Sequence, residues 1–580
     1  MAQSVPNPTS AANVPEFRPE LAFPQLTEEM VERLRGYGQE EIVAANQCLF
    51  SRGQRQVDML VVLDGEVVVS LPDPNGEPRV IAQHRRFEFS GELNLLNSQG
   101  SLVEAQTAME SRLLRIPRSQ LPRLMRAEGD IANLITQATI WRRIGILGDE
   151  LGGVTLVGQP GDAEMTQIQR FLIRNTYPHR ILEAASDENS LLDDGLTDAE
   201  ALLPAVALSD GRVLRRPTIS ELADELGITE LPDPDVIYDV TVVGAGPAGL
   251  AAAVYAASEG LCTIIIEGTA PGGQAGTSSK IENYLGFPTG ISGQRLASRA
   301  QLQALKFGVR FAISREVITV EQVGGLHRLT LAGGISLCSR SVVVASGAQY
   351  RKLSVEDYER FENHGIYYAA TAMESLLCRD KEVIVVGGGN SAGQAAVFLS
   401  GIAKHVHHLI RGKSLASTMS QYLISRIENS SHITLYTESE IVKLEGESAL
   451  EGVTWIDRRS GELTVKPIGS VFVMIGAEPN TGWLYGTVKL DKKGFILTGG
   501  TEGFQATPYA TSVPGMFAVG DVRSDSVKRV ASAVGEGSVV ISDVHRYLAD
   551  YRNSFAAEPN SALAALRSAS AAIAQHAPES

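Results

Sequence analysis

Two segments of the chain share one pattern: a β-branched strand, a glycine-rich turn, a helix of small residues and a second strand. Residues 238–268 read YDVTVVGAGPAGLAAAVYAASEGLCTIIIEG, and residues 382–412 read EVIVVGGGNSAGQAAVFLSGIAKHVHHLIRG. In such a unit the glycines let the backbone turn tightly and approach a pyrophosphate, which the helix N-terminus then faces. The repeated pattern predicts an α/β fold that holds two dinucleotides.

The first unit carries all the features of a dinucleotide site. Gly244 is expected to make the tight turn, Gly246 to admit the pyrophosphate, and Gly249 to let the helix pack closely on the strand. Glu267 ends the second strand 23 positions after Gly244, where an acid accepts hydrogen bonds from ribose hydroxyls. A glycine motif alone is weak evidence for a dinucleotide site. Here the strand, the helix and the acid all stand at the expected positions, so a dinucleotide site is favoured over a turn that serves the fold alone.

The second unit repeats the turn but ends differently. Gly387, Gly389 and Ala392 fill the three glycine positions, and Arg411 stands at the end of the second strand in place of an acid. A cation there lies near the 2′-phosphate of NADPH. Two sites in one unit predict a tightly held flavin and an exchanging nicotinamide. The residues expected to hold the nicotinamide nucleotide are Gly387, Gly389, Asn390, Ser391, Ala392, Arg411 and Lys413.

Further motifs relate this part of the chain to a known family. From Tyr238 to Leu548 the sequence resembles the low-molecular-weight thioredoxin reductases, flavoproteins whose nicotinamide domain is inserted into the flavin domain. The resemblance implies an FAD-binding domain over 237–349 and 480–550 and an NAD(P)-binding domain over 350–479. The motifs that carry it are PGGQAGTSSKIENYLGFP (271–288), VVVASGA (342–348), VMIGAEPNT (473–481), GMFAVGDV (515–522) and KRVASAVGEG (528–537).

The same resemblance implies roles for residues outside the glycine turn. Gln274 and Asn283 are expected near the flavin, and Asp521 at its ribityl-phosphate region. Arg529, Val530 and Ala531 are expected to flank the isoalloxazine. The remaining residues expected at the FAD site are Pro247, Ala248, Gly273, Gly347 and Gly520.

One departure from the family bears on chemistry. The family's Cys-x-x-Cys maps onto Ala369 and Ala372 in the stretch YYAATAMES, and alanine has neither a nucleophile nor a redox couple. Cys378 has no resolving partner nearby in sequence. A dithiol relay is therefore not expected. The family's arginine cluster for the 2′-phosphate also survives only in part, since Gly412 and Ala416 replace later members.

The four cysteines do not form a motif of another kind. Cys48, Cys262, Cys338 and Cys378 lie far apart and include no Cys-x-x-Cys pair, so their spacing predicts neither a metal site nor a local redox pair. We expect all four to be ordinary buried thiols, because free cysteine behaves as a small hydrophobe.

The front of the chain predicts a flexible lead over 1–25 and an antiparallel β-roll within 26–148. Asp64-Gly65 and Asn75-Gly76 are expected to be hairpin turns. LFSRG, MLVVLDGEVVVS and FSGELNLL resemble a cyclic-nucleotide-binding domain, in which Gly91 to Leu93 would hold the cyclic phosphate and Glu92 the ribose. No Lys or Arg occurs between Arg86 and Arg112, and a buried phosphate without a cation is costly. A degenerate domain, used for another ligand or for packing, is favoured.

Residues 152–230 resemble a glutaredoxin or thioredoxin fold. The order is strand, turn, helix and strand, followed by a strand led by Pro204, expected to be cis, a turn at Asp210-Gly211 and a helix. Where such folds place redox cysteines this chain has Gly158 to Asp162, so a docking or structural module is expected. A Pro/Asp linker covers 231–236, and the tail, 551–580, has no predicted role.

Composition narrows the class of protein. A formal charge of −16 and the lack of a basic block argue against nucleic-acid or acidic-membrane binding. No stretch reaches the roughly 18 apolar residues of a membrane span, and the N-terminus does not read as a leader, so a cytoplasmic protein is expected.

The sequence predicts a multidomain, homodimeric FAD enzyme that takes hydride from NADPH or NADH. Without a dithiol, electrons pass from the flavin directly to an unidentified acceptor: dioxygen, a quinone, a ferredoxin or a biosynthetic substrate. Two alternatives stay open. One is a flavoprotein sensor or scaffold without sustained turnover, and the other is an enzyme like the ferredoxin-NADP reductases, which resemble this family and also lack the cysteines.

Overall fold

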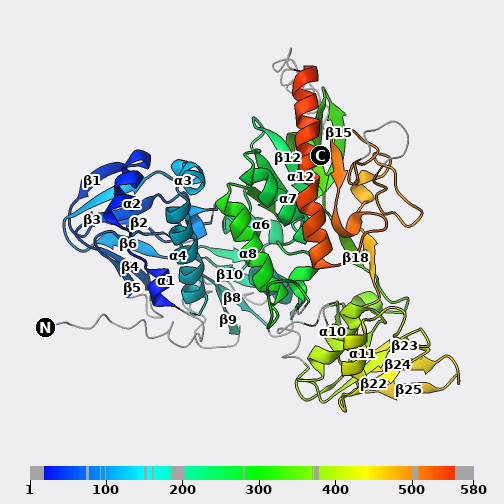
Figure 1. The fold of residues 1–580 in the computed structure, drawn as a ribbon. Coiled ribbons are helices and arrows are strands. Elements are labelled where there is room, and N and C mark those ends of the chain that lie inside the picture. Colours follow the sequence, from blue (N-terminus) through cyan, green and yellow to red (C-terminus); the bar gives the residue numbers. More distant parts are fainter. Residues whose placement is uncertain are drawn as a thin grey trace, which may run out of the picture.

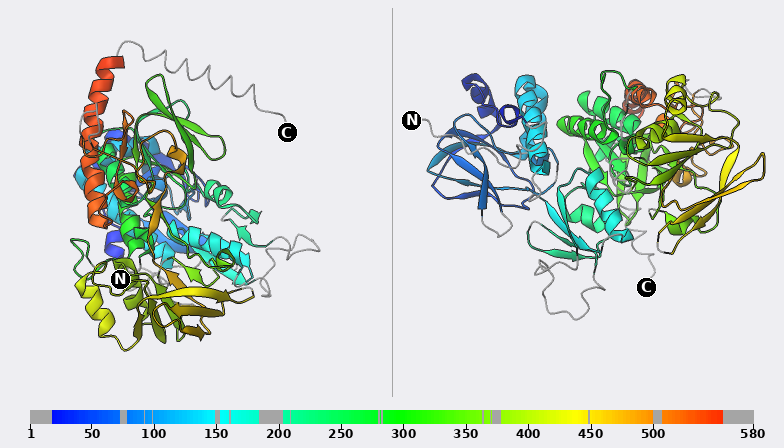
Figure 2. Two further views of the ribbon diagram at one scale, coloured as in Figure 1. Left: turned by 90° about the vertical axis from the view of Figure 1, so that its right-hand side faces the viewer. Right: turned by 90° about the horizontal axis from the view of Figure 1, so that it is seen from below.

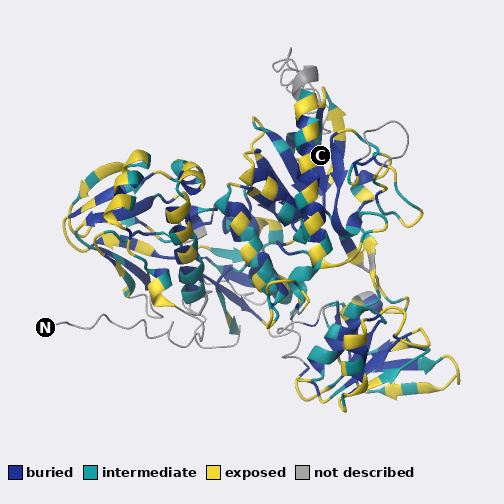
Figure 3. Ribbon diagram, viewed as in Figure 1, coloured by how far each residue is buried: buried dark blue, intermediate teal, exposed yellow. Residues whose placement is uncertain are grey.

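The computed structural model describes residues 18–555 except 73–77, 92, 98, 149–152, 160–161, 184–202, 209, 279–280, 282, 363, 369, 371–377, 448 and 500–506. The chain forms four bodies, of which the last, the nicotinamide lobe, is inserted into the third, the flavin body (Figure 1). A β-rich front lobe and a nicotinamide lobe lie at opposite ends, with a small middle unit and a large flavin body between them (Figure 2). Each body has at least one sheet of its own, and the central strands are buried whereas edge strands such as β1 (Gln39–Val43) and β25 (Leu463–Lys466) are largely exposed or half-buried (Figure 3).

The front lobe is a roll of two antiparallel sheets covered by helices on the side that faces the flavin body (Figure 1). One sheet has the order β1-β7-β3 and the other β2-β6-β4-β5. The strands are β1 (Gln39–Val43), β2 (Cys48–Phe50), β3 (Met59–Asp64), β4 (Val67–Pro72), β5 (Pro78–His84), β6 (Glu104–Thr107) and β7 (Ser111–Ile116), and the helices include α2 (Glu28–Leu34), α3 (Leu121–Ala127) and α4 (Gly129–Gly148).

The predicted hairpin at Asp64-Gly65 is wrong. The strands on either side of it, β3 and β4, belong to different sheets and pair with β7 and β6. Gly65 has φ +94°, and a Cβ there would lie 2.7 Å from the Cα of Ser111, so the chain turns a corner against the start of β7. The dipeptide marks a turn, but the two strands pair with strands that are 34 or more residues away in the sequence. Asn75-Gly76 falls outside the described residues, and β4 and β5 on either side of it pair antiparallel.

The middle unit has a four-stranded sheet of order β11-β10-β8-β9. Strands β8 and β9 are parallel because helix α5 crosses between them, whereas β10 runs antiparallel to both of its neighbours. The peptide bond before Pro204 is cis, as predicted. The elements are β8 (Val154–Gly158), α5 (Ala163–Arg174), β9 (His179–Glu183), β10 (Ala205–Ala207), β11 (Val213–Arg215) and α6 (Ile219–Glu225).

The flavin body is built on a sheet of order β14-β13-β12-β17-β16-β15, to which β28 adds beside β17. Its parallel half is covered by α7, α8 and α12, and α7 packs against α12 (Figure 1). The bounds are β12 (Ile237–Val243), α7 (Pro247–Ser258), β13 (Thr263–Glu267), α8 (Gly293–Lys306), β14 (Arg310–Ile313), β15 (Val317–Val323), β16 (Leu326–Leu331), β17 (Ser336–Val344), β28 (Met516–Ala518) and α12 (Val530–Phe555).

The nicotinamide lobe has a parallel sheet of order β19-β26-β20-β21-β22 and a separate antiparallel sheet, β23-β24-β25. The chain enters and leaves it through two paired strands, β18 (Ala348–Tyr350) and β27 (Ala477–Pro479). The other elements are β19 (Ile366–Tyr367), β20 (Glu382–Val386), α10 (Asn390–Leu399), β21 (His405–Leu409), α11 (Gln421–Glu428), β22 (Ile433–Tyr436), β23 (Ser439–Glu445), β24 (Gly452–Asp457), β25 (Leu463–Lys466) and β26 (Val471–Val473).

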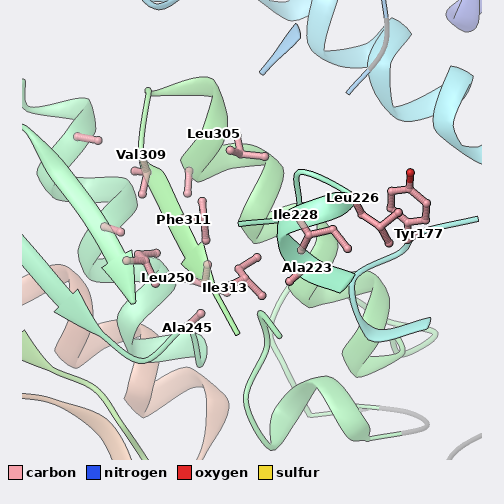
Figure 4. Close-up of a cluster of buried hydrophobic side chains, with 14 of the residues drawn as sticks. Tyr177, Ala223, Leu226, Ile228, Ala245, Leu250, Leu305, Val309, Phe311 and Ile313 are labelled. Carbon is pink, nitrogen blue, oxygen red and sulfur yellow. The ribbon is translucent and has the colours of Figure 1, made fainter. Parts of the chain in front are cut away.

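The middle unit is joined to the flavin body by buried contacts. Figure 4 shows Leu226 and Ile228 beside the strand that carries Phe311 and Ile313, within one continuous apolar cluster. At the edge of this interface Arg315 donates to both carboxylate oxygens of Asp224 at 2.7 Å. The middle unit therefore shares an apolar core with the flavin body, in addition to the covalent link between them.

Candidate dinucleotide sites

The first glycine turn is shaped by close approach. Gly244 has φ +106°, and a Cβ there would collide with the carbonyl of Ala345 on the neighbouring strand end. A Cβ at Gly249 would collide with the carbonyl of Gly244, so the first turn of α7 lies directly on the glycine turn. Gly246 caps α7 and faces open space. The three glycines therefore lie where the sequence predicts a dinucleotide turn.

Glu267 holds this turn by backbone hydrogen bonds. Its Oε2 accepts from the Ala245 N–H at 2.7 Å, and its Oε1 accepts from the N–H groups of Thr269 and Ala270 at 2.9 and 3.2 Å. A carboxylate has about four lone-pair positions, so a ribose hydroxyl can still be accepted. The acid thus fixes the turn in addition to its predicted contact with the ribose.

Two distant loops complete a cradle around the start of α7. A Cβ at Gly273 would lie 3.1 Å from the Cα of Gly246, and one at Gly520 would lie 3.0 Å from the Cβ of Ala248. Pro247 is the first residue of this helix. Glycine at both positions therefore lets the two loops approach the start of α7 closely, as a dinucleotide site requires.

The other predicted flavin residues differ in their contacts and exposure. The Gln274 side chain donates to the carbonyl of Ala348, next to Gly347, whose own carbonyl accepts from Asn480 at 3.0 Å. Asn283 is exposed, as are Arg529 and Ala531 at the start of α12, and Val530 is half-buried. Burial raises the pKa of Asp521, whose carbonyl accepts from Lys528 at 3.2 Å.

Glu536 is a residue of this site that sequence reasoning missed. It is buried within α12, and its Oε2 accepts from the N–H of Gly520 at 2.7 Å. Its Oε1 accepts from Arg523 at 2.8 Å. The carboxylate thus fixes the loop that carries Asp521. An acid between two glycines of a small-residue helix was the available signal.

The second glycine turn has the same shape. Gly387 has φ +140°, and a Cβ there would lie 3.2 Å from the Cβ of Ala392, which is fully buried. Gly389 caps α10, and Asn390 and Ser391 begin it. Arg411 and Lys413 are exposed, and in the described part of the chain no carboxylate lies within 4 Å of either cation. Both charges are therefore available to a phosphate.

Known proteins share this arrangement. The pyridine nucleotide-disulphide oxidoreductase profile matches residues 238–537, which is more than half of the chain. The chain belongs to this family. Thioredoxin reductase from Mycolicibacterium smegmatis is 34% identical over 314 residues, 54% of this chain and 97% of that protein. A component of alkyl hydroperoxide reductase from Escherichia coli is 30% identical over 378 residues, 64% of this chain and 70% of that protein.

A solved structure agrees with these relatives. Thioredoxin reductase from Lactococcus lactis, in its FR conformation, superposes with a TM-score of 0.50 and 28% identity, covering 54% of this chain and 99% of that one. The predicted resemblance to thioredoxin reductases is confirmed, and the chain is an FAD-dependent oxidoreductase. The family uses FAD together with NADPH or NADH. Both glycine turns have the backbone shape that such dinucleotides require.

In this pyridine nucleotide-disulphide oxidoreductase, the structure describes only part of the segment onto which the family's Cys-x-x-Cys maps. Ala369 and Ala372 lie outside the described residues. Just before them, Tyr367 is buried with its ring 5.5 Å from that of Phe472, and the guanidinium of Arg170 on α5 lies 6.0 Å from the same ring. The middle unit therefore touches the nicotinamide lobe beside this segment.

The prediction that all four cysteines are buried is wrong. Only Cys378 is fully buried, in the apolar core of the nicotinamide lobe. Cys48 and Cys262 are exposed and Cys338 is half-buried. Cys48 is the exposed first residue of a short strand whose last residue, Phe50, is buried, and Cys262 lies in the turn between α7 and β13, where its N–H donates to Asp239. Thiols at turns and strand ends stay near solvent.

The front lobe is also related to a known family. The cyclic nucleotide-binding domain profile matches residues 40–128, which confirms the predicted resemblance. Glu92 lies outside the described residues. Ser101, Leu102 and Val103, in the stretch where the family's phosphate-binding arginine is expected, are buried. Arg142 enters from α4 instead, and its guanidinium donates to the carbonyls of Phe89 and Gly91. The guanidinium of Arg142 is therefore bound to carbonyls of the protein itself. This residue was not identified from the sequence.

In the middle unit the predicted cysteine-free turn is partly visible. Asp162 caps α5 by accepting from Met165 at 2.7 Å, and Gln159 is exposed. A Cβ at Gly158 would lie 2.7 Å from the sulfur of Met165. Pro160 and Gly161 lie outside the described residues. The relation of this unit to the thioredoxin fold stays a prediction.

Two other kinds of site are not found among the described residues. Over residues 18–555, gaps aside, no helix is long and apolar enough to cross a bilayer. Across the same residues no group of three or more His, Cys, Asp or Glu side chains is arranged to hold a metal ion.

Proposed function

We propose that the protein is an NAD(P)H oxidoreductase whose flavin passes electrons directly to an acceptor, without a Cys-x-x-Cys relay. The observation that carries the proposal is a combination within one chain. Both dinucleotide turns of the family are built, yet no two cysteines of the sequence are spaced as a Cys-x-x-Cys pair. When bound, FAD takes a hydride from the nicotinamide and holds two electrons until an acceptor removes them.

The chain's own residues supply binding and orientation. The N-termini of α7 and α10 face the positions of the two pyrophosphates, and Arg411 with Lys413 offers charge to a 2′-phosphate. Glu267 and Glu536 hold the backbone of the flavin cradle in place. Each role follows from where the residue lies relative to the glycine turn of the flavin body or of the nicotinamide lobe.

The remaining thiols are poor substitutes for the dithiol. Cys378 has 0% exposure, so a disulfide substrate cannot reach it without opening the core of the lobe. Burial raises the pKa of Cys262 and of Cys338, which lowers the fraction of reactive thiolate at neutral pH. Electron transfer by the flavin itself is the simpler route.

A test of the proposal separates entry of electrons from their exit. In anaerobic stopped-flow, NADPH should bleach the flavin band near about 450 nm, a property of flavins in general. Reoxidation is then followed with dioxygen, a quinone and a ferredoxin in turn. A variant with Ser at all four cysteine positions should reoxidise at the wild-type rate. Loss of turnover on replacing Cys378 alone would contradict the proposal.

A second candidate function is a sensor whose flavin state is transmitted to the front lobe. A chain of polar contacts supports it. Arg143 on α4 donates to the carbonyl of Thr176 at 2.8 Å, and two residues earlier Arg174 donates to the carbonyl of Gly273 at 3.3 Å. This path joins the front lobe to the flavin cradle through the end of α5. It is a spatial connection, and coupling needs its own measurement.

Hydrogen exchange distinguishes the two candidates. Reduction of the flavin by dithionite in a sensor should change the protection of residues 99–103 and 173–177, and Arg143→Ala should abolish the change in the front lobe only. An enzyme without signalling should show changes confined to the flavin body and the nicotinamide lobe. Steady turnover with any acceptor of the panel would favour the enzyme.

A further inference from the structure

The second glycine turn is held from outside by two side chains. The Nε2 of His408, on β21, lies 2.7 Å from the carbonyl oxygen of Gly387. The Oγ1 of Thr418 lies 2.6 Å from the carbonyl oxygen of Gly388. A carbonyl only accepts, so His408 carries its proton on Nε2 and Thr418 donates its hydroxyl proton. Two consecutive peptide groups of the turn are thus anchored.

His408 occupies a position at which the fold itself does not require a polar ring. It is fully buried and pairs with Val385 in the parallel sheet, and its Nδ1 has no hydrogen-bond partner among the described residues. Burial lowers the pKa of the imidazole, which therefore stays neutral near pH 7. Burying a polar ring with one unsatisfied nitrogen costs free energy. The hydrogen bond to Gly387 is what the ring contributes in return.

The first dinucleotide unit supplies an internal comparison. There the strand pair β12 and β13 has the same parallel register, and the position that corresponds to His408 is Ile265, which pairs with Val242 and is also fully buried. The carbonyl of Ala245, which corresponds to Gly388, accepts from the backbone N–H of Gly272 at 2.7 Å. An aliphatic residue therefore satisfies packing at this position, and only the second turn recruits side chains as donors.

The anchored carbonyls fix the direction of the opposite N–H groups. In a trans peptide the C=O and the following N–H point to opposite sides, so holding the carbonyls of Gly387 and Gly388 aims the N–H groups of Gly388 and Gly389 away from His408 and Thr418. Neither N–H donates to a backbone or side-chain acceptor in the described chain. Both stand at the N-terminus of α10, where an anion is stabilised.

We propose that His408 and Thr418 are positioning residues that preorganise this turn for the pyrophosphate of the nicotinamide nucleotide. The inference rests on the proposed function, because it requires that a nicotinamide nucleotide bind at the second turn. The two residues should affect the binding of ligands that contain a pyrophosphate, whereas contacts with the adenosine 2′-phosphate should be independent of them.

The test compares two ligands on the full chain with FAD bound. NADP⁺ contains the pyrophosphate and adenosine 2′-monophosphate lacks it, and both are titrated calorimetrically. In His408→Leu and Thr418→Val the dissociation constant for NADP⁺ should rise about three- to tenfold, the size of one lost hydrogen bond. The constant for adenosine 2′-monophosphate should not change. In turnover, KM for NADPH should rise while kcat is retained.

Matched variants guard against general damage to the lobe. His408→Gln places an amide N–H within reach of Gly387 and should recover most of the affinity for NADP⁺. His405→Leu is the control, because His405 lies on the same strand and hydrogen-bonds Thr434, away from the turn. Thr418 is exposed, so Thr418→Val tests the idea even if His408→Leu does not fold.

The outcomes are distinct. If the variants lose affinity for both ligands equally, or bind NADP⁺ as the wild type does, His408 and Thr418 are not positioning residues and the proposed function still stands. If the FAD-loaded wild type binds neither ligand, the proposed function fails and this inference fails with it.

Discussion

The guanidinium of Arg174 lies 3.3 Å from the carbonyl oxygen of Gly273, so the last turn of α5 in the middle unit is in contact with the flavin cradle. Gln294 strengthens this junction from the flavin body, because its side-chain amide donates to the carbonyl of Ile173 at 2.7 Å. The middle unit is therefore in direct contact with the loop that carries Gly273 and Gln274, which is predicted to lie near the flavin.

The first prediction concerns disulfide substrates. The purified protein should reduce neither thioredoxin nor an aromatic disulfide with NADPH faster than free FAD does at the same concentration, because Ala369 and Ala372 cannot exchange thiols. The measurement is the rate of thiol release. A rate well above the free-flavin control that disappears in the variant with Ser at all four cysteine positions would show that a thiol route exists.

The second prediction concerns the close contact between α7 and the first turn. Gly249→Ala should destabilise the flavin body by about 1–3 kcal/mol and cause loss of FAD, since its Cβ would collide with the Gly244 carbonyl. Gly246→Ala is the contrasting variant. Its Cβ meets no protein atom within 4 Å, so the polypeptide should keep its stability in the absence of flavin. Chemical denaturation of flavin-free protein measures both, and equal stabilities would contradict the prediction.

The third prediction concerns the front lobe. Calorimetric titration with cyclic AMP or cyclic GMP should show no binding tighter than about millimolar, because buried Leu102 and Val103 stand in the stretch where a phosphate cation is expected and Arg142 is held by backbone carbonyls. A micromolar dissociation constant would overturn the prediction and would make Glu92 the residue to replace.

The fourth prediction concerns the choice of nicotinamide. NADPH should reduce the flavin at lower concentration than NADH, because Arg411 and Lys413 are free of carboxylate partners among the described residues. Arg411→Ala should raise the concentration of NADPH needed for half-maximal bleaching and leave that of NADH unchanged. Equal effects on both nucleotides would show that Arg411 does not contact a 2′-phosphate.

The fifth prediction concerns pH. Burial lowers the pKa of His327, on β16, from 6.5 to about 4. Between these values the unfolded chain binds a proton that the folded chain excludes, so the free energy of unfolding contributed by this group is intact above pH 6.5 and falls as the pH drops toward 4. The loss is about 3 kcal/mol at its limit.

His327→Leu should therefore flatten the decline of stability between pH 6.5 and 4 relative to the wild type. Urea unfolding at a series of pH values, followed by flavin fluorescence, measures the two slopes. Parallel profiles for His327→Leu and the wild type would contradict the prediction.

Features that depend on local chemistry were predictable from the sequence. The glycines at 244–249 and 387–389 indicate their turns because only glycine tolerates the collisions at Gly244 and Gly249. The cis bond before Pro204 was likewise expected, because the order of elements around it resembles a thioredoxin fold, in which a cis-proline precedes the third strand. At Gly249 the collision is with a residue five positions earlier in the chain, whereas at Gly244 it is with the distant Ala345, so the glycine pattern indicates the turn without identifying every residue that packs against it.

Features that depend on distant partners were not predictable. The turn at Asp64-Gly65 has the sequence of a hairpin, although its strands pair with β6 and β7, and exposure of Cys48 and Cys262 is set by where their strands end. The roles of Arg142, Glu536 and His408 arise only when elements far apart in sequence meet. A single sequence carries the residue types but not these pairings.

The antiparallel pairing of β18 with β27 brings the entry and exit of the nicotinamide lobe side by side, with Tyr350 opposite Ala477. Residues that face each other across such a pair lie only about 5 Å apart. Residues 351–476 therefore begin and end at one place on the surface of their own core. We therefore expect a gene fragment for this segment to fold by itself, because its two ends can be left free or joined by a short linker without stretching the chain. For the same reason, a lobe of different coenzyme preference could replace it without lengthening either connection.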